Sequence, residues 1–254
     1  MRKKLLAILI MIVMAVSCMA PAIVSADTYV KSGYACKAKN NVYFAFASTK
    51  KSTPIYKFNV KTGKRTKVYP VNRSSLKEFK NLNVLGKYIY CSARPVSSLT
   101  CTYIYRINIK TGKAKRLARG TNPTVVNGKI VFEGVKSQKI NDNLSVRYVP
   151  SGKSYEIEPE GGKKKPVSHT EVLAEASCRG TKIASGKYQF YISKDGKKIY
   201  RLNGKKKKQI CKAKKITGFR VLGGYLVVKT TKNGKNYAYC VKNNGSKSMR
   251  MLKW

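Results

Sequence analysis

A short segment recurs along this chain at the spacing of a repeat protein. Residues 55–64, IYKFNVKTGK, return 49 residues later as residues 104–113, IYRINIKTGK. Weaker copies begin near Tyr155, Tyr200 and Tyr239. Recurrence of one motif at intervals of about 40–50 residues is typical of a chain built from one supersecondary unit used several times. We therefore expect a single repeat array rather than unrelated domains.

A second element precedes each copy of this motif. It contains a Gly or Asn turn followed by aromatic and aliphatic residues, and it occupies 40–44, 86–90, 128–132, 186–190 and 223–227. In the third unit the turn is Asn127-Gly128, a strong signal for a two-residue hairpin. The aromatic and β-branched residues alternate with period two, which excludes helices.

Each unit thus predicts four short antiparallel strands, and such units are typical of a β-propeller. The fold class is all-β, with about five four-stranded blades at 28–72, 73–119, 120–169, 170–212 and 213–254. A sixth blade, or an open array, is left open. The third unit carries an insertion, 137–154, between its second and third strands.

Turn positions also predict the strand register. A two-residue turn at Asp195-Gly196 places Tyr191 opposite Tyr200, and one at Asn233-Gly234 places Val228 opposite Tyr239. The same register in the first unit places Ala45 opposite Tyr56. We expect the tyrosine at this position of every unit to pack between blades. These tyrosines are Tyr56, Tyr105, Tyr155, Tyr200 and Tyr239.

Residues 103–117, YIYRINIKTGKAKRL, resemble the repeats of bacterial TolB-like and low-density-lipoprotein-receptor-like β-propellers. Those repeats often read aromatic, aliphatic, tyrosine and then a (D/T)-G turn, and the likeness covers nearly all of 28–254. This chain departs from the pattern because lysine replaces most acidic residues. The resemblance implies a fold and carries over no catalytic residue, since one fold hosts many functions.

The N-terminus has the layout of an export signal. Arg2, Lys3 and Lys4 precede an unbroken apolar run at 5–16, and 24–26 (VSA) offers small residues for cleavage after Ala26. Twelve apolar residues are too few to span a bilayer, which needs roughly 20. We expect a signal peptide at 1–26 and a secreted or cell-surface chain at 27–254, with no transmembrane segment after cleavage. The alternatives are an uncleaved anchor and lipoprotein processing at Cys18.

Lysine and arginine number 54 against 10 acidic residues, giving a formal net charge of +44. Such an excess predicts contact with a polyanion, such as teichoic acid, anionic lipid, nucleic acid or an acidic glycan. The candidate binding residues are the lysines assigned to third hairpins. They are Lys61, Lys64, Lys110, Lys113, Lys163, Lys164, Lys165, Lys205, Lys206, Lys207 and Lys208. The alternative is that lysines only protect exposed strand edges and keep the chain soluble.

Six cysteines follow the signal, an even number that suggests disulfides in an exported protein. Cys91 and Cys101 flank one hairpin and form the candidate pair, although the register above places Cys91 opposite Tyr105. The cysteine spacings do not indicate a zinc site.

The sequence predicts no catalytic residues, no metal site and no cofactor. His169 is the only histidine. Glu156, Glu158 and Glu160 alternate along one strand, where we expect them to neutralise lysines such as those at 163–165. The favoured function is therefore an exported non-catalytic binding or scaffold propeller. The alternatives are a lyase or hydrolase acting on an anionic polysaccharide, and a module that binds a protein partner.

Overall fold

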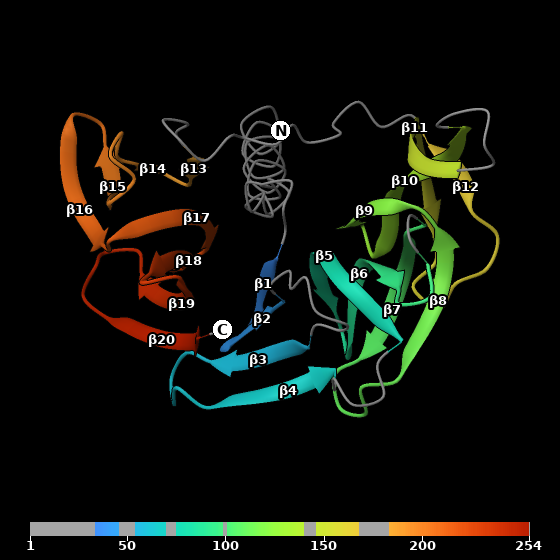
Figure 1. The fold of residues 1–254 in the computed structure, drawn as a ribbon, viewed down its shortest axis with the longest axis horizontal. Helices are drawn as coiled ribbons and strands as arrows, with labels where there is room; N and C mark the ends of the chain where they lie inside the picture. The colour runs from blue at the N-terminus through green and yellow to red at the C-terminus, as the bar shows by residue number, and fades with distance from the viewer. Residues whose placement is uncertain are drawn as a thin grey trace, which may run out of the picture.

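The computed structural model describes residues 34–45, 54–69, 75–98, 101–139, 146–167 and 183–253. The expected signal peptide at 1–26, His169 and Cys178 lie outside these residues. The described residues form five four-stranded antiparallel sheets and contain no helix (Figure 1). None of them belongs to a helix that could cross a membrane. These residues form an all-β propeller of five four-stranded blades.

Every blade is a simple meander in which consecutive strands pair. Blade 1 contains β1 (Ala35–Ala38), β2 (Asn41–Phe44), β3 (Ile55–Asn59) and β4 (Arg65–Tyr69). Blade 2 contains β5 (Leu76–Leu85), β6 (Tyr88–Pro95), β7 (Tyr103–Asn108) and β8 (Ala114–Arg119). Blade 3 contains β9 (Thr121–Val126), β10 (Lys129–Lys139), β11 (Val146–Ile157) and β12 (Lys165–Val167). Blade 4 contains β13 (Ile183–Ser185), β14 (Tyr188–Ile192), β15 (Lys198–Asn203) and β16 (Lys206–Lys212). Blade 5 contains β17 (Lys215–Leu222), β18 (Tyr225–Lys232), β19 (Lys235–Lys242) and β20 (Ser248–Lys253).

One register between the second and third strands holds in all five blades. The expected pairs Tyr191–Tyr200 and Val228–Tyr239 are present. In blade 1 the partner of Tyr56 is Phe44, so the expected Ala45 was wrong by one residue. The equivalent pairs in the remaining blades are Cys91–Tyr105 and Phe132–Tyr155. Phe44 is the fourth residue of β2, as Cys91 is of β6, so the strand start fixes the register where the loop length does not.

Apolar clusters between sheets show the order of the blades around the molecule. One cluster joins blades 4 and 5, a second joins blades 5 and 1, a third joins blades 1 and 2, and a fourth joins blades 2 and 3. The first and last blades of the chain are therefore neighbours. Among the described residues no such cluster joins blades 3 and 4, and these two blades stand at the two ends of an arc (Figure 1).

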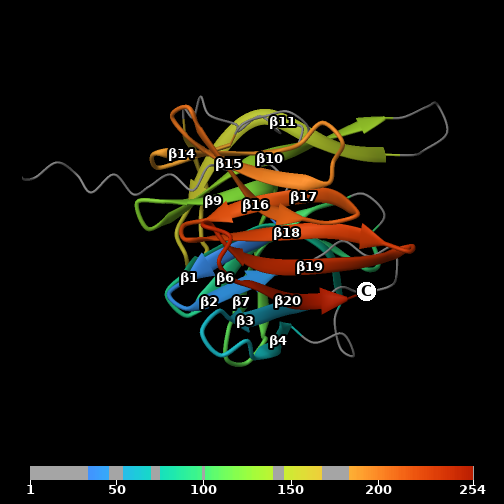
Figure 2. The same cartoon turned by 90° about the vertical axis from the view of Figure 1, so that its left-hand side faces the viewer.

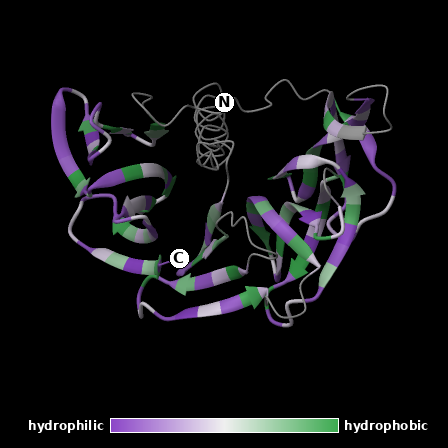
Figure 3. Cartoon of the chain, viewed as in Figure 1, coloured by the Kyte–Doolittle hydropathy of each residue, from purple (hydrophilic) through white to green (hydrophobic). Residues whose placement is uncertain are grey.

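The position of a blade in this arc decides which faces of its strands are buried. Consecutive buried residues in β6 and β18 show that both faces of these strands are covered. In β14 burial alternates, because only one face of blade 4 meets a neighbour. Hydropathy alternates visibly along many strands (Figure 3).

The repeat tyrosines follow the same rule. Four of them join the clusters between blades, as the sequence predicts: Tyr56, Tyr105, Tyr155 and Tyr239. Tyr200 is the exception. It occupies the face of blade 4 that has no neighbouring blade, and there it stacks on Tyr191 with ring centroids 5.5 Å apart.

The insertion expected at 137–154 is a continuation of two strands rather than a separate loop. β10 and β11 remain paired from Val135–Pro150 to Lys139–Val146, beyond a bulge between Glu133 and Val135. The resulting two-stranded ribbon projects from the side of the molecule (Figure 2).

Candidate functional site

The first and third hairpins of a blade lie side by side on one face, which we call the top face. Backbone hydrogen bonds join them directly. The amide of Val60 donates to Asn40 O at 2.9 Å, and that of Ile109 donates to Lys87 O at 3.0 Å. In blade 5 the amide of Asn243 donates to the carbonyl of Gly224 at 2.9 Å. The bottom face carries the second hairpins and the connections between blades.

The repeated sequence N-x-K-T-G-K builds the third hairpin of blades 1 and 2. In blade 2, Asn108 Oδ1 accepts hydrogen bonds from the amides of Lys110 (2.9 Å) and Thr111 (3.0 Å). Thr111 Oγ1 accepts one from the amide of Lys113 at 3.3 Å. Gly112 closes the turn with φ of 69°, a conformation that glycine adopts without strain.

Blade 1 repeats these contacts with Asn59, Thr62 and Gly63. In both copies the Asn, Thr and Gly thus form the turn. The two lysines make no such side-chain contact and are exposed, Lys61 and Lys64 in blade 1 and their equivalents in blade 2. The turn therefore fixes the backbone from which two exposed cationic side chains extend on the top face.

All eleven lysines proposed from the sequence are exposed. Seven lie in third hairpins on the top face: Lys61, Lys64, Lys110, Lys113, Lys163, Lys164 and Lys205. The other four were expected in hairpins but lie in the outer strands β12 and β16: Lys165, Lys206, Lys207 and Lys208. None of the eleven forms an ion pair with a described carboxylate.

The described acidic residues near the top face belong to blade 3, and they already have partners. Lys129 Nζ lies 2.8 Å from Glu156 Oε1 and 3.7 Å from Glu158 Oε1. The hydrogen bond to Glu156 raises the pKa of Lys129. Arg106 Nη1 lies 3.9 Å from Glu160 Oε1. The sequence led us to expect lysines at 163–165 as the partners. Strand pairing does place Lys165 opposite Glu156, but the ion pairs are formed by Lys129.

Each of two blades also has a tyrosine near the top face whose ring is contacted by cations. The guanidinium of Arg106 lies 4.4 Å from the ring centroid of Tyr88, and Lys87 Nζ lies 5.6 Å from it. In blade 4 the same positions hold Arg201 over Tyr188 at 4.2 Å.

These arginines also reach the third hairpin of the next blade. Arg106 donates to Pro159 O and Arg201 to Asn243 O, both at 3.3 Å. Sequence reasoning missed this arrangement. Its signal is the arginine that directly follows the repeat tyrosine in units 2 and 4.

Exposed lysines are not confined to the top face. The second hairpins of blades 4 and 5, on the bottom face, carry Lys194, Lys197, Lys232 and Lys235. Asp195 lies in the same turn as two of them, where hydrogen bonds from the Ser193 hydroxyl and the Lys197 amide lower its pKa. Hence the feature that distinguishes the top face is the repeated, side-chain-fixed turn rather than charge alone.

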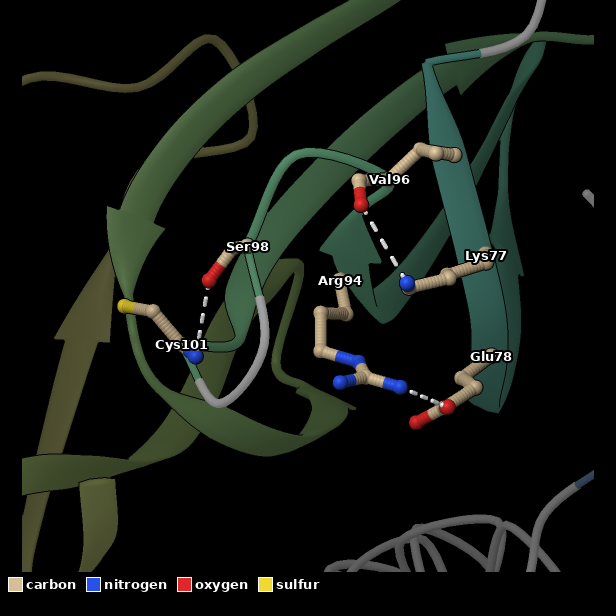
Figure 4. Close-up of polar contacts among 6 residues, drawn as sticks. All are labelled: Lys77, Glu78, Arg94, Val96, Ser98 and Cys101. Carbon is tan, nitrogen blue, oxygen red and sulfur yellow. Dashed lines mark hydrogen bonds and ion pairs between the residues drawn. The ribbon is translucent and has the colours of Figure 1, made fainter. Parts of the chain in front are cut away.

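The expected Cys91–Cys101 disulfide is not formed in the structure, where both residues are buried free thiols. Cys91 lies opposite Tyr105 and faces the core between blades 1 and 2. Burial raises the pKa of the Cys91 thiol well above its usual range. The amide of Cys101 donates to Ser98 Oγ at 3.0 Å (Figure 4). The strand register therefore places the Cys91 side chain on an interior face of the sheet.

Polar contacts beside this hairpin hold the bottom of blade 2 together (Figure 4). Arg94 pairs with Glu78, and Lys77 Nζ donates to Val96 O at 3.2 Å. Within the described residues no three His, Cys, Asp or Glu side chains gather as metal ligands would. The groups that the described surface offers to a ligand are therefore mainly cations.

No family model and no curated protein matches this chain. Among solved structures it is similar to the β-propeller domain of the trilobed protease from Pyrococcus furiosus (TM-score 0.39, 13% identity, 86% of this chain and 84% of that one). It is also similar to a chain of the nidogen/laminin complex (TM-score 0.34, 15% identity, 85% and 75%). A third similar structure is the tricorn protease (TM-score 0.36, 14% identity, 87% of this chain), of which this chain spans 22%, about a fifth. At such identities the likeness concerns the fold alone.

Proposed function

We propose that this chain is a non-catalytic binding or scaffold propeller whose top face contacts an anionic polymer. The observation that carries the proposal is the third-hairpin turn of blades 1 and 2. Its Asn, Thr and Gly residues are used for the turn itself, and each copy presents two exposed lysines without a described carboxylate partner.

Cations carried on repeated turns of one face suit a polymer with many negative charges. Each lysine that meets a phosphate or sulfate releases condensed counterions, so affinity grows with the number of simultaneous contacts.

Edge protection explains a different set of lysines. Lys207 and Lys208 lie in β16, the outer strand of blade 4, where lysine discourages the addition of another strand. Lys207 Nζ also lies 4.0 Å from the ring centroid of Tyr200. The turn lysines of blades 1 and 2 protect no strand edge, so the proposal rests on them.

The test compares binding of the purified protein to heparin, duplex DNA and teichoic acid across a salt series. Two variants each remove four charges by Lys→Gln substitution. The top-face variant changes Lys61, Lys64, Lys110 and Lys113. The bottom-face control changes Lys194, Lys197, Lys232 and Lys235.

We expect the top-face variant to bind at least tenfold more weakly than the control near 0.1 M salt. Its log–log salt slope should fall by about 1 for each lost phosphate contact. Equal weakening of both variants would show that net charge alone attracts the polymer. Absence of binding by the native protein to all three polymers would overturn the proposal.

The finer assignments belong to the same proposal. The aromatic, aliphatic, tyrosine and T-G pattern at 103–117 supports a place among TolB-like propellers, and the n-region and apolar run before residue 27 support export. An exported basic propeller would meet anionic polymers of the cell surface or of the extracellular medium.

A further inference from the structure

A buried arginine lies in the first strand of blade 5. Arg220 is only 4% exposed and pairs across the sheet with Val227. Its neighbours Phe219 and Val221 belong to the core shared with blade 4, whereas Leu222 and Val227 belong to the core shared with blade 1. Because side chains alternate along a strand, Arg220 is directed towards blade 1. β17 contacts β1 of that blade.

The side chain of Arg220 has a buried Nε that lacks a hydrogen-bond acceptor. No described carboxylate forms an ion pair with this side chain. By contrast, Arg106 and Arg201 each combine a backbone carbonyl with a tyrosine ring. A buried cation without a counter-charge is strongly destabilising.

The two blades around Arg220 contain no acidic residue from which a counter-charge could come. Residues 28–77 and 196–254 include neither Asp nor Glu. The charged side chains that face this region are also cations. Lys229, diagonal to Arg220 on β18, lies 5.0 Å from the ring of Tyr34, and Lys37 of β1 lies 5.9 Å from the ring of Tyr225.

We propose that Arg220 binds a single small oxyanion, a phosphate or a carboxylate, between blades 5 and 1. The planar guanidinium donates two parallel hydrogen bonds to two oxygens of such a group. The small exposed fraction of Arg220 requires a small ligand, and Lys37 and Lys229 add attraction for an anion. This site is separate from the exposed top-face lysines, so either proposal can fail without the other.

The experiment follows thermal unfolding of the purified protein while sodium phosphate or sodium acetate replaces sodium chloride at constant ionic strength. Constant ionic strength removes the general screening effect expected for a highly basic chain. Arg220→Met removes the site, and Arg250→Met is the matched control, an exposed arginine of the same blade.

We expect saturating phosphate or acetate to raise the Tm of the native protein and of Arg250→Met by roughly 3–6 °C. Arg220→Met should show no rise, and in chloride alone it should be at least as stable as the native protein. A rise with only one anion identifies which oxyanion class the site takes. An equal rise in Arg220→Met, or no rise in the native protein, would overturn the proposal.

A second measurement keeps the proposal testable if Arg220→Met does not fold. The Nε–Hε resonance of Arg220 in ¹⁵N-labelled native protein should shift and saturate as phosphate or acetate is added. A resonance that does not move with either anion would overturn the proposal.

Discussion

At the scale of single residues, one set of side chains in the repeated turn stabilises its backbone and another set carries its charge. Asn108 and Thr111 satisfy three backbone amides of the turn, and Gly112 supplies the left-handed conformation. Lys110 and Lys113 take no part in these side-chain contacts and remain exposed. Turn stability and surface charge should therefore respond to different substitutions.

Asn108→Ala removes the acceptor of two amide hydrogen bonds and should lower the free energy of unfolding by about 1–2 kcal/mol. Gly112→Ala should cost about 1 kcal/mol because φ is 69° there, a conformation that L side chains rarely adopt. Lys110→Ala, in the same turn, is the control and should change stability by less than about 0.5 kcal/mol. Urea unfolding measures all three. A cost for Lys110→Ala equal to that for Asn108→Ala would contradict this division.

Buried tyrosines should make the fold less stable at high pH. Burial, only partly offset by the nearby Arg116 charge, raises the pKa of Tyr105 from 10.0 to about 12. The unfolded chain loses this proton near pH 10 and the folded chain only near pH 12, so Tyr105 favours unfolding as the pH rises between these values.

The comparison of native protein with Tyr105→Phe isolates this effect, since lysines deprotonate over the same range in both. The native urea midpoint should fall relative to that of the variant as the pH rises from 10 towards 12. A difference between the two midpoints that is constant with pH would show that Tyr105 ionises equally in both states.

At the scale of elements, much of the fold is predictable from the sequence. The register between the second and third strands of a blade is also predictable, apart from one error of a single residue. Turns at Asp195-Gly196 and Asn233-Gly234 predict the pairs Tyr191–Tyr200 and Val228–Tyr239, which the structure contains. The error at Ala45 arose because the loop after β2 differs in length, while the structure keeps the count from the start of the strand.

The contacts of the candidate site were harder to predict. Its exposed lysines could be found because turn motifs are local. The ion pairs of Lys129 with Glu156 and Glu158 depend on pairing between strands, and the arginine contacts depend on which blades are neighbours. Neither the ion pairs nor the arginine contacts can be predicted from spacing along the chain.

Equivalent tyrosines should differ in energy because their blades differ in position. Tyr105 is 7% exposed in the core between blades 1 and 2, whereas Tyr200 lies on the face of blade 4 without a neighbouring blade. Tyr105→Ala should cost about 3–5 kcal/mol. Tyr200→Ala should cost about 1 kcal/mol, from lost stacking on Tyr191 and lost contact with Lys207. Equal costs in urea unfolding would mean that this face of blade 4 is packed as the others are.

At the scale of the whole molecule, blades 4, 5, 1, 2 and 3 form an arc joined by four apolar clusters. Packing of blade 5 against blade 1 brings the two halves of the chain together, and Arg65 strengthens the contact by donating to Met251 O at 2.8 Å. This arrangement places the third hairpins of successive blades along one face. The lysines of these hairpins therefore lie on the same face.

The most direct test of this surface is the reactivity of individual lysines towards acetylation, read by mass spectrometry with and without heparin. We expect heparin to slow the modification of Lys61, Lys64, Lys110 and Lys113 severalfold. The bottom-face lysines Lys194, Lys197, Lys232 and Lys235 should react at nearly unchanged rates. Equal protection of both sets, or protection of the bottom-face set alone, would contradict a polymer-binding top face.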